Sequence, residues 1–77
     1  MEDLATQIMD ALKGLDICDT FYTLHQFDPN RRYLRETLYR KGTDLVNRFY
    51  KVAGYIVRVR YHEKTGEITN IHIEEEK

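Results

Sequence analysis

The arginines and lysines of this chain are concentrated in one central block, and clustered cations are typical of surfaces that bind anions. Residues 31–60 hold nine of the twelve lysine and arginine residues and only two acidic residues, Glu36 and Asp44, so this block has a formal charge of +7. The formal charge is −5 over residues 1–30 and −3 over residues 61–77, so the net charge of −1 hides a polarised molecule. Because aromatic residues lie among these cations, the block predicts a surface for an anionic partner, and nucleic acid is the first candidate.

Eleven residues of this region are candidate nucleic-acid contacts. Asn47, Arg48 and Lys51 share the outer face of an expected helix, where asparagine pairs with adenine and arginine or lysine with guanine. The other cations are expected to hold phosphates, which position a protein without reading sequence: Arg31, Arg32, Arg35, Arg40, Lys41, Arg58, Arg60 and Lys64. The alternative for these cations is a solvated face, or pairing with the protein's own carboxylates.

The histidines are the remaining candidates for catalysis. His62 and His72 lie on opposite strands of an expected hairpin, and a His–Arg–Tyr grouping can cleave phosphodiesters by general acid–base chemistry. Together with His25 they do not have the spacing of a recognised metal site. Cys18 is the single cysteine, so an internal disulfide or a cysteine metal cluster is excluded. We therefore expect a protein that is not an enzyme and has no metal or cofactor, with a small ribonuclease as the weakest alternative.

Length and composition predict one domain over residues 1–77, near the lower limit for a chain that folds on its own core. Dimerisation would add stability to so small a domain, so a homodimer is expected. No apolar run approaches the roughly 18 residues of a membrane span, and no signal peptide is recognised, so we expect a soluble cytoplasmic protein. The acidic end at 74–77 is expected to be frayed.

Hydrophobic periodicity predicts three helices, over about residues 2–14, 29–41 and 44–52. Asp28 and Pro29 suit the start of the second helix, and Thr43 suits the N-cap of the third. A strand over 45–52 is the rival interpretation, but adjacent apolar pairs interrupt its alternation, so the helix is favoured. Residues 18–27 are rich in β-forming residues and predict a short strand.

The last third of the chain changes to a period of two, which predicts a C-terminal β-hairpin. Matching the apolar faces pairs Val57 with Ile73 and Val59 with Ile71. This register leaves a three-residue loop over 64–66, whose glycine is free to adopt the left-handed conformation of a bulged turn.

The expected order α-β-α-α-β-β, three helices with a C-terminal hairpin in one small α+β domain, is that of a winged-helix domain. In such a domain the third helix enters the major groove and the hairpin lies along the DNA backbone. The sequence therefore predicts a DNA-binding transcription regulator, with duplex DNA favoured over RNA. The alternative is a protein-interaction module, such as a small inhibitor or antitoxin-like protein, whose basic face meets an acidic protein partner.

Overall fold

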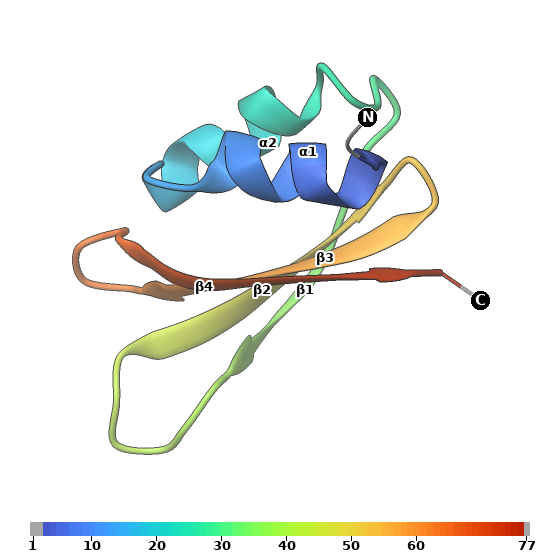
Figure 1. Cartoon of the computed structure of the whole chain (residues 1–77). Coiled ribbons are helices and arrows are strands. Elements are labelled where there is room, and N and C mark those ends of the chain that lie inside the picture. The colour runs from blue at the N-terminus through green and yellow to red at the C-terminus, as the bar shows by residue number, and fades with distance from the viewer. Residues whose placement is uncertain (1–2, 77) are drawn as a thin grey trace.

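The computed structural model describes residues 3–76 and contains two helices on one side of a four-stranded antiparallel sheet (Figure 1). The elements in chain order are α1 (Leu4–Leu12), α2 (Ile17–Leu24), β1 (Arg32–Leu38), β2 (Leu45–Val52), β3 (Tyr55–His62) and β4 (Ile68–Glu75). Each strand pairs with its neighbour in the sequence, so the sheet is a meander in the order β1-β2-β3-β4. The tip of the β1–β2 hairpin projects away from the helices (Figure 1).

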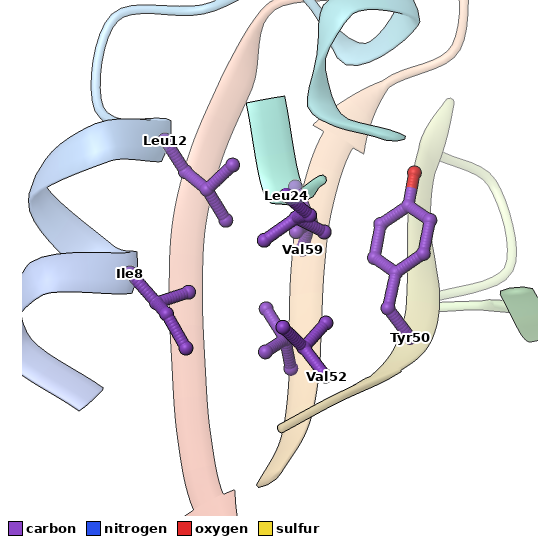
Figure 2. Packing of buried hydrophobic residues seen from close by; sticks show 7 residues of the cluster. Ile8, Leu12, Leu24, Tyr50, Val52 and Val59 are labelled. Atoms are coloured by element: carbon purple, nitrogen blue, oxygen red, sulfur yellow. The ribbon is translucent and has the colours of Figure 1, made fainter. Parts of the chain in front are cut away.

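The hydrophobic core lies between the helices and the face of the sheet that they cover. Ile8 and Leu12 of α1 and Leu24 of α2 are fully buried. They pack with four buried residues of the central strands, namely Tyr50, Val52, Val57 and Val59 (Figure 2). Side chains alternate between the faces of a strand, so the residues between these core positions lie on the face that carries no helix.

The first helix agrees with the prediction from sequence, whereas the strand predicted over 18–27 is wrong. Most of that segment is α2, whose N-cap Asp16 accepts a hydrogen bond from the backbone N–H of Cys18 at 3.0 Å. Thr20 and Leu24 lie four residues apart on the buried face of this helix. N-capping and burial of one helical face therefore outweigh the β-propensity of the segment.

The helix predicted over 44–52 is also wrong, and the rival strand interpretation is confirmed as β2. Val46, Tyr50 and Val52 are buried on the helix-covered face, and Arg48 lies between them on the same face. Leu45 and Phe49 lie on the opposite face. Because both faces of β2 carry apolar residues, the sequence does not show the alternation of polar and apolar residues that indicates a strand.

The helix predicted over 29–41 is replaced by β1 and the turn that follows it. Asp28 does not cap a helix: its carboxylate accepts hydrogen bonds at 2.8 Å from the backbone N–H groups of Asn30 and Ala53. Asp28 therefore ties the segment that leads into β1 to the two-residue turn between β2 and β3. Both residues of this turn have a positive φ, 50° at Ala53 and 85° at Gly54. Thr43 accepts from the N–H of Leu45 inside the β1–β2 turn. The protein is a small α+β domain, but the winged-helix prediction is wrong because the described chain has two helices and four strands.

The predicted hairpin is confirmed as β3 and β4, with the Val57–Ile73 and Val59–Ile71 pairs in place. The register shifts after the pair of Arg60 with Asn70, so that Tyr61 rather than His62 lies opposite Ile68. This bulge makes room for a four-residue turn over 63–66, which ends at Gly66 with φ 81°. Of the acidic end that was expected to fray, residues 74 and 75 belong to β4, and residue 77 lies outside the described residues.

Candidate nucleic-acid interface

The face of the sheet that carries no helix, which we call the open face, is built from alternate residues of all four strands. The strand registers arrange twelve of its residues in three rows across the sheet, Arg32-Lys51-Ile56-Glu74, Arg35-Phe49-Arg58-His72 and Thr37-Asn47-Arg60-Asn70. Five of these twelve residues carry a positive charge and one carries a negative charge, so the open face is strongly basic.

Two arginines of the open face lie over aromatic rings. The guanidinium carbon of Arg60 is 3.6 Å from the ring centroid of Tyr39, and that of Arg35 is 4.4 Å from the ring centroid of Phe49. Arg60 is held further by a hydrogen bond from its Nε to Oδ1 of Asn47 at 3.1 Å. Stacking on a ring fixes a guanidinium without neutralising its charge. Both arginines therefore remain available to an anion.

Arg58 lies in the middle of the open face with an incomplete set of partners. One terminal nitrogen donates to Oδ1 of Asn70, while the buried Nε has no hydrogen-bond acceptor among the described residues. Burial lowers the pKa of Arg58, and the neighbouring charge of Arg60 lowers it further. A buried donor without an acceptor is costly. An anion that accepts from Arg58 would remove this cost and offset the repulsion between the two arginines.

Carboxylates lie at the margins of the open face rather than at its centre. The Nζ of Lys51 is 3.1 Å from a carboxylate oxygen of Glu76, and Nδ1 of His62 is 2.8 Å from a carboxylate oxygen of Asp44. The hydrogen bond with His62 lowers the pKa of Asp44 against the opposing effect of burial. Among residues 3–76, no carboxylate lies within ion-pair distance of Arg35, Arg58 or Arg60.

Arg48, predicted as a base contact, lies on the helix-covered face inside a polar network. Its Nε donates to a carboxylate oxygen of Glu36 at 2.7 Å, and its terminal nitrogens lie 3.3 Å from the hydroxyls of Tyr50 and Tyr61. Tyr61 also donates to Glu36 at 2.5 Å. Burial, followed by this hydrogen bond, raises the pKa of Tyr61 to about 12. Arg48 is therefore neutralised within the fold and is not available to a nucleic acid.

The structure divides the eleven predicted contacts between the open face and other places. Six lie in the three rows of the open face: Arg32, Arg35, Asn47, Lys51, Arg58 and Arg60. Of the other five, Arg40 and Lys41 lie in the β1–β2 turn, Lys64 in the β3–β4 turn, and Arg48 on the helix-covered face. Arg31 stacks on Phe21 of α2 at 3.9 Å and donates to its carbonyl oxygen.

The two hairpin histidines do not form a catalytic pair. His72 lies opposite Arg58, four residues along β3 from His62. At about 3.3 Å per residue, this places the two positions about 13 Å apart along the strand, too far for both to act on one phosphodiester. Among residues 3–76, no group of three histidine, cysteine, aspartate or glutamate side chains is arranged to hold a metal ion.

Three residues of the open face were not among the eleven contacts predicted from the sequence. Phe49 lies against the guanidinium of Arg35 on the open face, because β2 is a strand and not the expected helix. Tyr39 follows β1, and its contact with Arg60 depends on the β1–β2 hairpin. Asn70 lies opposite Arg60 in the register that the sequence did predict, so its place on the polar face could have been found.

Comparisons with protein-family models, with curated proteins and with solved structures found no match for this chain. Neither helix of the described residues is both long and apolar enough to cross a membrane.

Proposed function

We propose that this protein binds nucleic acid on the open face and has no enzymatic activity. One observation carries this proposal: five cations and one carboxylate occupy the three rows of the open face, and the central arginine has an unsatisfied buried donor. Phosphate groups supply what Arg35, Arg58 and Arg60 lack among the described residues, which is a negatively charged partner with several strong acceptors.

A nucleic acid would contact the sheet and not the helices. Neither α1 nor α2 contains an arginine or a lysine, and each contains one aspartate, Asp10 in α1 and Asp19 in α2. An acidic helix would be repelled by phosphates at the edges of the major groove. The insertion of a recognition helix, which a winged-helix domain requires, is therefore not part of this proposal.

Fluorescence anisotropy with a labelled random-sequence oligonucleotide of twenty nucleotides tests the proposal. If the five cations each contact a phosphate, the affinity falls roughly 100- to 500-fold between 50 and 200 mM salt. The double variant Arg58→Gln/Arg60→Gln should bind more weakly, with a salt slope that is smaller by about 1.5. The matched control, Lys13→Gln/Lys64→Gln, removes the same charge away from the open face and should bind as the wild type does.

The same titration can also refute the proposal. Absence of binding at 50 mM salt, or an affinity that does not depend on salt, would exclude a phosphate-binding surface. If the wild type retains an acidic protein but no oligonucleotide, and the Arg58→Gln/Arg60→Gln variant loses that protein, the open face serves a protein partner instead. A homodimer remains a prediction, which sedimentation at several protein concentrations would test.

A further inference from the structure

The two arginine–aromatic pairs of the open face have a geometry suited to a particular kind of nucleic acid. Arg60 covers the ring of Tyr39, and Arg35 covers the ring of Phe49. One side of each guanidinium plane is thus occupied by a ring, which leaves the other side for a second flat group. Unpaired bases stack on arginine planes as well as on aromatic rings.

We infer that these pairs are platforms on which unpaired bases stack, so that the ligand is single-stranded nucleic acid; the inference rests on the proposed function. A base placed on Arg60 would extend a stack that begins with Tyr39, and a base on Arg35 would extend the stack that begins with Phe49. In a duplex the flat sides of the bases are covered by their neighbours, so a duplex cannot use either platform.

Arg58 lies close enough to Arg60 for one strand to reach both. The two residues belong to adjacent rows, and two residues along a strand span about 6.6 Å at 3.3 Å per residue. A single strand could therefore place a phosphate against Arg58 and a neighbouring base on Arg60, which combines a basic groove with a stacking platform.

The guanidinium of Arg60 is held in place before any ligand binds. Asn47 accepts from Nε of Arg60 at 3.1 Å while the ring of Tyr39 lies beneath the guanidinium, so this plane is already oriented in the free protein. Side chains that are fixed before binding lose less conformational entropy when the ligand arrives. Within the described residues, Arg32 on the same face lies over no aromatic ring and therefore supplies a comparison.

The test compares three ligands of equal length: a single-stranded oligonucleotide, the same strand with every base removed, and the corresponding duplex. We expect the wild type to bind the intact single strand at least tenfold more tightly than the abasic strand, and more tightly than the duplex. Arg60→Lys keeps the charge but loses the planar group. It should weaken binding of the intact strand about five- to tenfold while leaving the abasic strand and the salt slope unchanged.

Two controls separate stacking from charge and from folding. Arg32→Lys is an equally conservative change at a cation without an aromatic partner, so any effect on affinity should be the same for the intact and the abasic strand. Tyr39→Leu should weaken binding of the intact strand in the same way as Arg60→Lys, with an unchanged circular dichroism spectrum. Equal binding of the intact and abasic strands by the wild type, preference for the duplex, or an equal effect of Arg60→Lys on both single strands would refute the platforms while leaving phosphate binding intact. Failure of all three ligands to bind would refute the proposed function itself.

Discussion

Replacing Glu36 with glutamine should lower the free energy of unfolding by about 2 kcal/mol at pH 7. The carboxylate accepts hydrogen bonds from Arg48 at 2.7 Å and from Tyr61 at 2.5 Å. A hydrogen bond to a charged group contributes about 1.5–3 kcal/mol, against about 1 kcal/mol for a neutral pair. Each of the two bonds therefore loses about 1 kcal/mol when the acceptor becomes a neutral amide.

The effect of Glu36→Gln should depend on pH in a direction that the structure fixes. Burial opposes ionisation of Glu36, but the hydrogen bonds from Tyr61 and Arg48 outweigh it and hold the pKa below its ordinary value of 4.5. A carboxyl group whose pKa is lowered by folding stabilises the protein above its unfolded pKa, and this contribution is lost as the pH falls through the folded pKa. The difference between wild type and variant should therefore be full at pH 7 and shrink in acid. Other carboxylates titrate in both proteins and cancel in the difference.

Urea denaturation of four proteins tests this reasoning: wild type, Glu36→Gln, Arg48→Met and the double variant. Arg48 and Glu36 are direct partners across β2 and β1. Removing one of them leaves the other without its charge partner, so the double variant should be more stable than the sum of the single effects predicts, by about 1 kcal/mol or more. Additive effects within about 0.3 kcal/mol, or a difference between wild type and Glu36→Gln that is as large in acid as at pH 7, would refute the network.

Three further substitutions test single features of the fold. Ala53→Asn should raise the melting temperature by about 2–6 °C, because asparagine accepts the positive φ of 50° that strains alanine in a two-residue turn. Gly66→Ala should destabilise the protein by about 2 kcal/mol, because φ is 81° and the new Cβ would lie 2.6 Å from a carboxylate oxygen of Asp16. Urea denaturation should show a smaller loss of stability when the same substitution is made in an Asp16→Ser variant, where the shorter serine still caps α2. Thr20→Val should cost about 1–3 kcal/mol because the buried hydroxyl of Tyr50 loses the shorter of its two hydrogen bonds, at 2.6 Å, and keeps only the contact with Arg48, whereas Thr20→Ser should cost less.

The C-terminal hairpin could be predicted from the sequence because its two faces differ in polarity. Val57 and Val59 face the core, while Arg58 and Arg60 face the open side, so only one register matches apolar with apolar. The sequence did not indicate the bulge in β4, because the extra residue changes the turn length without changing which residues face the core.

The first two strands could not be predicted in the same way because their polarity does not follow their faces. Arg48 lies on the helix-covered face and Phe49 on the open face, the reverse of the usual pattern. Besides Tyr50 of the same strand, Arg48 is held there by Glu36 of β1 and the hydroxyl of Tyr61 of β3, and these contacts between strands are not visible in the local sequence. The candidate contacts could be predicted only in part for the same reason. The sequence shows the basic block, but which of its cations lie on the open face and which on the helix-covered face depends on how the strands pair.

The positions of the two acidic residues of the basic block explain why the open face keeps its charge. Glu36 pairs with Arg48 on the helix-covered face, and Asp44 pairs with His62 at the end of β3. Within residues 3–76, Arg35, Arg58 and Arg60 have aromatic rings and amide side chains as partners, and none of the three has a carboxylate within ion-pair distance. Rings and amides orient a guanidinium but do not cancel its charge. Within the described residues, the fold thus uses Glu36 to neutralise Arg48, the cation that it buries, and leaves the oriented arginines of the open face without a carboxylate partner.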